Sequence, residues 1–380
     1  MVTVYLIRHG EAEGNLYRRM HGHYDAALTD LGWRQIEALG KRFQNVHLDA
    51  VYSSDLCRAM HTGAVLCRTH SLPLRTDRRL REVNVGIWED ETFGNMRADW
   101  AEEMTRFFNQ PLSWHLPQAD SFPGLCRRTT EALRDIVAAH PGGAVAVCGH
   151  GYMINSILCS LIYGQENYAM TGQSTNTAVS CLTWDGARWT LQYKHDASHL
   201  GAGLLNLPKR RDMVIRPMAE DAVEEYIRYR KDAWQVVYGT LQGFDGSGFW
   251  LDAQRTLGPD PAAMVVSYLE GGPAGMIQLN PSRDARRGVG YIPFLYLREP
   301  FRHQGLGIQL IGHAVSFYRK LGRTKLQLSV APTNEKALGF YYKYGFTQAK
   351  KQRGRFGHLL LLKKDIAPPK PPEDVPIITM

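Results

Sequence analysis

Two histidines, two arginines and a glutamate in the first half of the chain have the chemistry needed to handle a phosphoryl group. Arg8 and His9 directly follow an apolar run, and His150 follows another. Arg58 lies in the first turn of a helix that begins just after a third such run. In open α/β sheets ligands bind at the carboxyl ends of the strands, so these side chains are expected to meet there. Glu82 lies in a segment that follows a further short extended run.

This combination points to phosphoryl transfer. The guanidinium fork matches the oxygens of a dianionic phosphoryl group. A neutral histidine can attack phosphorus and form a phosphohistidine, which divides hydrolysis into two easier steps. Cationic groups then stabilise the charge on the equatorial oxygens. The leaving oxygen needs a proton, which Glu82 can donate if its carboxyl group is protonated.

Alternating strands and helices must position these groups, which predicts an α/β sheet. A Trp-rich, irregular insertion is expected between Trp88 and Pro123, and segments of this length are commonly lids or substrate loops. The predicted strands span residues 2–7, 48–53, 72–76, 144–148, 177–184 and 189–194, and the predicted helices span 30–43, 56–67, 124–140 and 152–163.

The motifs of residues 1 to 200 resemble those of the histidine phosphatase superfamily, which includes the cofactor-dependent phosphoglycerate mutases. The matching segments are Arg8-His9-Gly10-Glu11 with Asn15, Gly22 to Thr29 with Gly32, Ser53 to Ala59, Leu80-Arg81-Glu82 with Gly86 and Trp88, and Gly149-His150-Gly151. The resemblance implies a phosphoglycerate-mutase-like three-layer α/β/α domain that acts on a small phosphorylated metabolite.

The same resemblance implies a role for each matching residue. His9 is the nucleophile and Glu82 the proton donor, while Arg8, Asn15, Arg58, His150 and Gly151 bind the phosphoryl group. After Glu82 the mutases carry a Glu-Arg-His-Tyr-Gly type of stretch, whereas this chain has Val83-Asn-Val-Gly-Ile-Trp88. That departure favours the phosphatase branch, and mutase activity is the alternative. His21 and His23 lie in a loop that either faces the substrate or is solvated.

The second half carries a different anion-binding pattern, Arg302-His303-Gln304-Gly305-Leu306-Gly307, between a strand and a helix. Glycines let the backbone approach an anion, and amides at a helix start can bind a pyrophosphate. The segment is neither a Walker loop nor a dinucleotide fingerprint. The predicted strands are 264–269, 275–279, 288–297, 325–330 and 356–362, and the predicted helices are 219–238, 249–256, 306–321 and 336–344.

Residues 213 to 362 resemble the GNAT acetyltransferases. The resemblance rests on Leu295 and Leu297 before the loop and on Asn334, Ala337, Phe340-Tyr341 and Gly345-Phe346 after it. It implies a GNAT α/β domain that uses acetyl-CoA to acetylate an amine. The implied cofactor-binding residues are Leu295, Leu297, Arg302, His303, Gln304, Gly305, Leu306, Gly307, Asn334 and Tyr341. Tyr341 would also protonate the departing thiolate, while Glu299 lies near the expected site but is not identified as the base.

Length and composition fit two domains with a basic surface. The 380 residues carry a net charge of +8, which suits anionic ligands. The expected boundaries are 1–208 for the phosphatase domain and 212–365 for the GNAT domain, with a polar hinge at 208–212 and a disordered Pro-rich tail at 366–380. The six cysteines lack metal-type spacing and are expected to be reduced thiols of a cytoplasmic protein.

Other classes of function are less consistent with the sequence. His195 and His199 have the spacing of a metal pair, but no third ligand is evident, so no metal is expected. The basic stretch Lys350 to Arg355 lacks a base-stacking motif, so nucleic-acid binding is not expected. No run reaches membrane-spanning length.

The sequence predicts a bifunctional enzyme. The alternative is a phosphatase with a non-catalytic, acyl-CoA-sensing GNAT domain, and the oligomeric state is open.

Overall fold

The computed structural model describes the whole chain except residues 206–210, 220, 257–259 and 355–356. The chain forms two compact units. The first comprises Met1–Glu91, Met96–Pro208 and Pro369–Met380, and the second comprises Thr92–Asn95 and Lys209–Pro368. The hinge expected at residues 208–212 lies partly outside the described residues.

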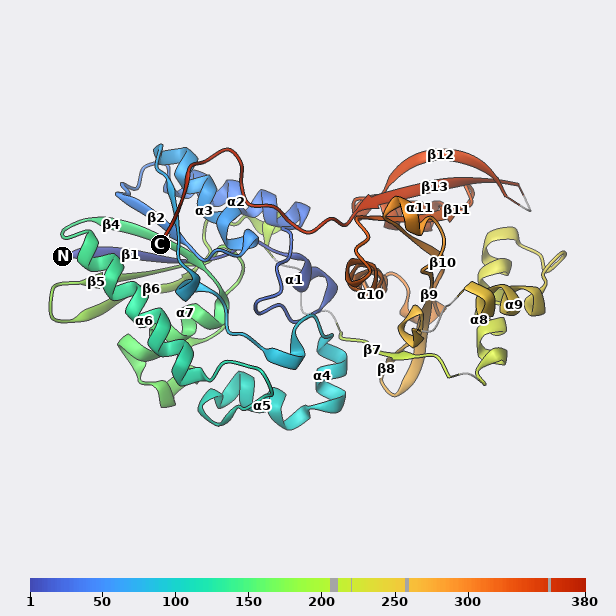
Figure 1. The fold of residues 1–380 in the computed structure, drawn as a ribbon, viewed down its shortest axis with the longest axis horizontal. Helices are drawn as coiled ribbons and strands as arrows, with labels where there is room; N and C mark the ends of the chain where they lie inside the picture. The colour runs from blue at the N-terminus through green and yellow to red at the C-terminus, as the bar shows by residue number, and fades with distance from the viewer. Residues whose placement is uncertain (206–210, 220, 257–259, 355–356) are drawn as a thin grey trace. The chain divides into compact units, whose positions relative to one another are not determined.

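The first unit is built on one mixed sheet of seven strands in the order β14-β3-β2-β4-β1-β5-β6 (Figure 1). The pairs from β14 to β1 are parallel, and β5 and β6 add antiparallel. The central strands are continuous apolar runs because helices cover both faces. The strands are β1 (Val2–Arg8), β2 (Ala50–Ser53), β3 (Leu74–Thr76), β4 (Ala144–Gly149), β5 (Val179–Trp184), β6 (Trp189–Asp196) and β14 (Ile377–Thr379).

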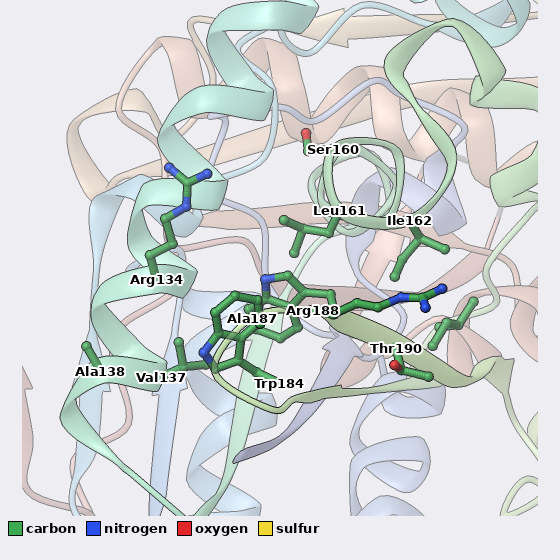
Figure 2. A pocket seen from close by; sticks show the side chains of 12 residues that line it. Arg134, Val137, Ala138, Ser160, Leu161, Ile162, Trp184, Ala187, Arg188 and Thr190 are labelled. Carbon is green, nitrogen blue, oxygen red and sulfur yellow. The ribbon is translucent and has the colours of Figure 1, made fainter. Parts of the chain in front are cut away.

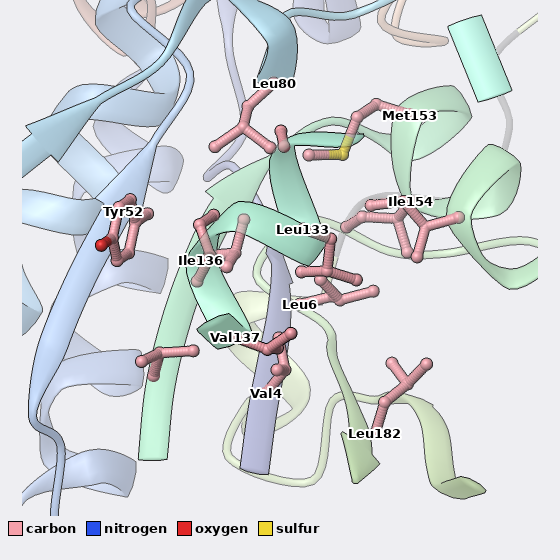
Figure 3. Close-up of a cluster of buried hydrophobic side chains, with 14 of the residues drawn as sticks. Val4, Leu6, Tyr52, Leu80, Leu133, Ile136, Val137, Met153, Ile154 and Leu182 are labelled. Carbon is pink, nitrogen blue, oxygen red and sulfur yellow. The ribbon is translucent and has the colours of Figure 1, made fainter. Parts of the chain in front are cut away.

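Helices cover this sheet on both sides, which confirms the predicted three-layer α/β/α arrangement. On one face, α2 and α3 pack through Phe43 and Met60 against Ile7 of β1. On the other, α6 and α7 pack through Leu133 and Ile154 (Figure 3). The helices are α1 (Glu13–Tyr17), α2 (Asp30–Phe43), α3 (Cys57–His70), α4 (Phe93–Asp99), α5 (Ala101–Asn109), α6 (Phe122–Ala139) and α7 (Gly151–Leu158).

The start of α2 fixes the loop that follows β1. Thr29 caps the helix by accepting a hydrogen bond from the Gly32 amide at 3.0 Å. A Cβ atom on Gly32 would lie 2.1 Å from the carbonyl oxygen of Glu11, so only glycine permits this contact. The Glu11 amide also donates to Gln35 Oε1 at 2.8 Å. The residues after His9 are therefore held against α2.

The segment between Trp88 and Pro123 is more regular than the sequence predicted, because it contains α4 and α5. Its aromatic side chains form a cluster beside α7. The Phe107 and Tyr152 rings stack with centroids 4.4 Å apart, and Trp114 lies 4.9 Å from Phe107 and 6.1 Å from Trp88. Tyr152 is the second residue of α7, so this cluster supports the helix that follows His150.

The Pro-rich tail is not disordered, and that prediction was wrong. Residues 377–379 form β14, which pairs in parallel with β3 from Leu74 to Thr76 at the edge of the sheet. Val375 is buried in the core between the sheet and α3. Asp374 forms an ion pair with Arg68 at 2.6 Å. Prolines have no backbone N–H to donate, which is why the tail was expected to lack structure. The residues after the prolines nevertheless provide a buried side chain, Val375, and a strand, β14.

Truncation after Pro368 is expected to lower the thermal midpoint of the first unit by about 5 °C or more. Burial of Val375 alone stabilises the fold by roughly 1.5 kcal/mol, and the strand pairing adds to it. The measurement is the heat inactivation of phosphatase activity. Ile378→Ala is the control, since that side chain is 40% exposed and should change the midpoint by about 1 °C or less. Equal midpoints for the truncated and full chains would refute the anchoring role.

The second unit is also a seven-stranded sheet, in the order β12-β13-β11-β10-β9-β8-β7 (Figure 1). Its strands are β7 (Val214–Pro217), β8 (Met264–Leu269), β9 (Gly272–Asn280), β10 (Val289–Leu297), β11 (Lys325–Val330), β12 (Thr347–Gly354) and β13 (Gly357–Asp365). Its helices are α8 (Val223–Tyr238), α9 (Gly246–Thr256), α10 (Gly307–Lys320) and α11 (Glu335–Lys343). The sequence did not predict β12, which contains most of the basic stretch 350–355, and the strand predicted from Phe356 begins outside the described residues.

The parallel strands β10 and β11 are paired along only part of β10. β10 pairs with β11 from Val289 to Ile292, whereas β10 itself continues to Leu297. Pro293 follows the last paired residue and has no N–H to donate. The backbone of β10 beyond Pro293 is thus not paired with β11. Along the described parts of the chain, no helix combines the length and apolar character needed to cross a membrane.

Candidate active sites

His9 and His150 occupy neighbouring strand ends in the first unit. The parallel register pairs Arg8 of β1 with Gly149 of β4, so the residues that follow both strands lie side by side. The His9 amide donates to the Gly149 carbonyl at 2.9 Å. The two imidazole centroids are 5.3 Å apart, and the side chains are 7% and 0% exposed. The sequence prediction that β1 and β4 deliver two histidines to one spot is met by this geometry.

The surroundings of His9 fix both its tautomer and its charge. Its Nδ1 lies 2.7 Å from the Gly10 carbonyl oxygen. A carbonyl only accepts, so Nδ1 carries the hydrogen and Nε2 keeps its lone pair. Burial lowers the pKa of His9 well below its usual value, and the positive charges of Arg58 and Arg8 lower it further. A neutral ring with a free Nε2 is the form that attacks phosphorus.

His150 and Arg8 present buried polar atoms that have no protein partner. Both ring nitrogens of His150 and Nε of Arg8 are buried without a hydrogen bond among the described residues. Such atoms are rare, and here they belong to neighbouring side chains. A Cβ on Gly151 would lie 3.5 Å from Arg8 Nε, so the start of α7 adjoins the same point. These groups together form a binding place for an anion with several oxygen atoms.

Charge and burial also act on His150. Its pKa is lowered well below the usual value, first by burial and then by the charge of Arg58. The neutral ring can donate one N–H to a phosphoryl oxygen. The other end of Arg8 is fixed, since its Nη1 donates to the Ser174 carbonyl. Arg8 is therefore oriented by the loop before β5.

Arg58 both carries charge to the site and organises it. Its guanidinium is 1% exposed and donates to the carbonyl oxygens of Tyr24, at 2.9 Å, and Gly22, at 2.7 Å. A third, longer bond reaches the His21 carbonyl at 3.3 Å. The fork has five N–H groups, so those not used by the loop are left for a phosphoryl oxygen.

Glu82 lies at the first turn of α7. Its Oε1 accepts from the Met153 and Val83 amides at 2.8 and 3.0 Å, and its Oε2 accepts from the Tyr152 amide at 3.1 Å. Each carboxylate oxygen has two acceptor positions. Oε2 therefore retains one acceptor position that no amide occupies. The helix N-terminus that binds Glu82 also contributes partial positive charge.

Residues that the sequence did not identify hold His9 in place. The Asn176 amide donates to the His9 carbonyl at 2.9 Å and lies 3.4 Å from Asn15 Oδ1. Thr62 Oγ1 accepts from the Gly10 amide at 3.1 Å and donates to the Arg58 carbonyl at 2.8 Å. Asn15 thus reaches His9 through Asn176. Thr62 follows Arg58 by one helical turn, which is the one signal in the sequence that could have identified it.

The other histidines have structural partners. His21 lies beside Tyr24 and 3.4 Å from the Asp90 carboxylate, and His23 Nε2 is 3.0 Å from the Glu82 carbonyl. His195 contacts the Thr171 carbonyl, and His199 contacts Thr177 and Arg42. The spacing of His195 and His199 therefore serves packing of β6 and the following turn. No group of three potential metal ligands occurs among the described residues.

Because the pKa of His9 is lowered, phosphatase turnover is expected to persist to a lower pH than a histidine with an ordinary pKa would allow. The neutral ring persists as pH falls through 6.5, so kcat at saturating substrate should stay level as pH falls from 7.5 through 6.5 and decrease only at lower pH. The unfolded chain takes up these protons near pH 6.5, so the stability of the unit should decrease as pH drops below 6.5. A kcat profile with a midpoint at 6.5 would contradict this assignment of charge.

In the second unit, the loop before α10 has the backbone geometry of an anion site. His303 and Gly305 adopt left-handed φ values of 60° and 69°, and α10 begins at Gly307. Alternating conformations of this kind turn successive N–H groups toward one point, and the first amides of a helix have no partner within it. Arg302 Nε donates to the Leu297 carbonyl at 2.8 Å, which ties the loop to the end of β10.

The segments predicted to bind acetyl-CoA come together around this loop. A Cβ on Gly307 would lie 3.2 Å from the Phe340 ring of α11 and 3.5 Å from Leu297. Leu295 and Leu297 are half-buried on the part of β10 that β11 leaves unpaired. These residues fit a pantetheine chain beside β10 and a pyrophosphate on the amides of residues 303–308.

Two residues of α11 have defined environments. Tyr341 is 8% exposed, and burial raises the pKa of its phenol, which keeps the proton on the oxygen for donation. Asn334 caps α11 by accepting from the Ala337 amide at 3.2 Å, which leaves its NH₂ group and one acceptor position of Oδ1 for a ligand. Glu299 is exposed, in the turn after β10. No observation gives it the position of a base.

A cavity of about 870 Å³ lies away from all these residues, in the first unit (Figure 2). It is bounded by α6, the π-helical turn Cys159–Tyr163 and the hairpin of β5 and β6. The rings of Trp184 and Trp189 lie 5.2 Å apart beside it. None of the residues that line it belongs to either group of catalytic candidates.

The two folds and their sites define a phosphoryl-transfer domain joined to an acyl-CoA-type domain, and comparison with known proteins agrees. The model of the histidine phosphatase superfamily (branch 1) matches residues 4–197, and that of the acetyltransferase (GNAT) family matches residues 221–346. The chain belongs to the histidine phosphatase superfamily and carries a GNAT domain after it. Both are families of enzymes.

Individual relatives match the first unit. A probable phosphoglycerate mutase GpmB of Yersinia pestis is 27% identical over 205 residues, which is 53% of this chain and 95% of that protein. The solved structure of Bacillus stearothermophilus YhfR is 30% identical with a TM-score of 0.51, over 52% of this chain and 99% of YhfR. A structure named mycobacterial hydrolase 2, at 24% identity and a TM-score of 0.50, covers 53% of this chain and 94% of its own and shares the fold.

Proposed function

We propose that the chain is a bifunctional enzyme that hydrolyses a small phosphate monoester and acetylates an amine. The observation that supports the first activity most directly is the pair of buried, neutral histidines, His9 and His150, whose rings lie 5.3 Å apart next to unpartnered N–H groups. This arrangement combines a nucleophile with donors for phosphoryl oxygens. It needs no metal for the chemistry described next.

The hydrolysis proceeds in two steps. Nε2 of His9 attacks phosphorus, the bond from phosphorus to the ester oxygen breaks, and Glu82 gives its proton to that oxygen. Water then attacks the phosphohistidine, Glu82 takes a proton from the water, and the P–N bond breaks to release phosphate. Arg8, Arg58 and His150 stabilise the charge on the phosphoryl oxygens in both steps.

The second activity rests on the loop before α10 and the unpaired part of β10. Acetyl-CoA supplies an activated acetyl thioester when bound. The amides of residues 303–308 would hold its pyrophosphate, Leu295 and Leu297 its pantetheine, and Arg302 fixes the loop to β10. Tyr341, kept protonated by burial, would protonate the thiolate. The six cysteines, all buried and free, support action in a reducing compartment such as the cytoplasm.

Phosphoglycerate mutase activity is the second candidate for the first unit, because the relatives from Yersinia carry that name. One assay separates the two. The protein is incubated with 3-phosphoglycerate, with and without a bisphosphorylated primer, and with a panel of other phosphate esters. Release of inorganic phosphate supports hydrolysis, whereas interconversion of phosphoglycerates without release would establish the mutase.

A non-catalytic GNAT unit is the second candidate for the other half. The same assay includes acetyl-CoA and a panel of amines, and mass spectrometry follows free CoA and acetylated product. Acetyl-CoA that is consumed in proportion to an amine product supports the transferase. Acetyl-CoA that changes the phosphatase rate without being consumed would show a regulatory domain.

A further inference from the structure

Arg230 of α8 lies in an aromatic setting on the same face of the second sheet as α9. Its guanidinium carbon is 4.0 Å from the centroid of Phe294, 4.9 Å from Phe249 and 5.3 Å from Tyr226. Its Nε donates to Tyr226 Oη at 2.9 Å, and its Nη2 donates to Gln278 Oε1 at 2.6 Å. The guanidinium therefore lies among these three rings and next to side chains of β9 and β10.

No ion pair of the described residues joins this guanidinium to a carboxylate, although the charge of Asp252 on α9 acts on it from a greater distance. Two of its five N–H groups are used by Tyr226 and Gln278, which leaves three. Gln278 is 0% exposed, and its own Nε2 has no partner among the described atoms. The oxygen of that amide faces Arg230, so its NH₂ group lies next to the guanidinium. Gln278 Nε2 is thus a buried donor without an acceptor, and the remaining N–H groups of the partly exposed Arg230 are available to a ligand.

Partial desolvation makes an anion a favourable partner for this guanidinium. Burial lowers the pKa of Arg230, because removing a cation from water destabilises its charged form. Aromatic faces offset part of that penalty. A carboxylate or phosphate would offset more, because it accepts two parallel hydrogen bonds from the guanidinium fork. Gln278 Nε2 can donate to the same group.

Arg230 contacts the part of β10 that is proposed to bind the acyl donor. Phe294, its closest aromatic contact, follows Pro293, and β10 is no longer paired with β11 there. This is the part of β10 assigned above to the acyl donor. On the α8 face Phe294 is followed by Tyr296, whose hydroxyl donates to Asp232 at 2.9 Å. An anion held by Arg230 would consequently lie beside the strand along which the thioester binds.

We propose that Arg230 and Gln278 bind the anionic group of the acyl acceptor, so that the GNAT unit acetylates amines that also carry a carboxylate or a phosphate. This inference depends on the proposed acetyltransferase function. It restricts the class of acyl acceptor from amines in general to amines that also carry an anionic group. A phosphorylated amine would be a substrate class that both units could handle.

The test compares acceptors that differ in the anionic group alone. Propylamine is paired with β-alanine for the carboxylate, and ethanolamine with phosphoethanolamine for the phosphate. The assays use the full chain with His9→Ala, so that phosphoethanolamine is not hydrolysed. We expect kcat/KM for at least one acidic amine to exceed that of its neutral partner by about tenfold or more.

Variants then separate recognition from a structural role. Arg230→Met should raise KM for the acidic amine by about tenfold while kcat, the KM for acetyl-CoA and the rate with neutral amines change little. Arg230→Lys keeps the charge but loses the fork, so it should recover only part of the loss. Arg228→Met is the matched control, because its side chain is on the same helix and 60% exposed.

Each result has a defined meaning. Equal losses for acidic and neutral amines, together with a lower melting temperature, would show that Arg230 only supports the fold and would overturn the proposal. If no amine in the panel is acetylated, β-alanine and phosphoethanolamine are titrated calorimetrically into CoA-saturated protein. Binding heat that Arg230→Met abolishes supports the proposal, and heat that is absent or unchanged overturns it. Failure of acetyl-CoA itself to bind would instead reject the proposed transferase function.

Discussion

His9→Ala is expected to lower phosphatase kcat by about a thousandfold or more, which is typical for loss of a nucleophile whose binding partners remain. Arg8 and Arg58 are cationic and cannot attack phosphorus, and the neutral ring of His150 is assigned to binding the phosphoryl oxygens, so no other side chain is expected to replace His9. Initial rates with the best ester of the panel provide the measurement. Acetyl-CoA binding by the same preparation should be unchanged and reports that the protein is folded.

The matched variant is His150→Ala, which removes a phosphate-binding group but keeps the nucleophile. It should also slow turnover, yet it should still form an acid-labile phosphoryl adduct that His9→Ala cannot form. Quenching in alkali and locating the adduct by mass spectrometry distinguishes the two variants. If His9→Ala retained turnover within tenfold of the unsubstituted protein, or if the adduct appeared on another residue, the covalent route through His9 would be wrong.

The proximity of the candidate site residues in the first unit was predictable because parallel strands align their ends. Arg8 and Gly149 are register partners, so residues that directly follow β1 and β4 must be neighbours. Sequence alone identifies such residues when each strand is a distinct apolar run that ends in a polar motif. Arg58 follows the same logic, because β2 pairs with β4 and α3 begins a few residues later.

The supporting contacts were not predictable, because they join residues far apart in the chain. Asn176 bonds to His9 across 167 positions, and Ser174 bonds to Arg8 across 166. Both lie in a loop with no periodic pattern. The tautomer of His9 likewise depends on the carbonyl of Gly10, which any residue would possess. Local patterns thus indicate which groups react, whereas tertiary structure decides how they are held.

Burial also reversed a prediction drawn from composition. The prolines of the tail suggested disorder, yet Val375 finds an apolar core and Ile377–Thr379 finds an unpaired strand edge. Arg230 was not singled out in the sequence, and its contacts with Phe294 and Gln278 likewise exist only in the folded chain. In each case the decisive partner comes from a distant segment. Propensity and charge therefore set a prior expectation that tertiary contacts can override.

Gly305→Glu should weaken acetyl-CoA binding by about a hundredfold or more, as measured by isothermal titration. Gly305 has a φ of 69°, which side chains rarely adopt, so the loop would have to rearrange. The new carboxylate would also lie among the amides proposed to bind the pyrophosphate, and like charges repel strongly there. A hundredfold change corresponds to about 2.7 kcal/mol.

Gly322→Glu is a close control for this prediction. Gly322 also has a φ of 69°, it follows the other end of α10, and a Cβ there meets no atom within 4 Å. The control therefore adds the same strain and the same charge without approaching the loop at residues 302–307. We expect its affinity for acetyl-CoA to stay within about threefold of the unsubstituted protein. Equal effects of the two substitutions would mean that backbone strain, rather than the position of Gly305 at the start of α10, determines binding, and the pyrophosphate site would then have to be sought elsewhere in the second unit.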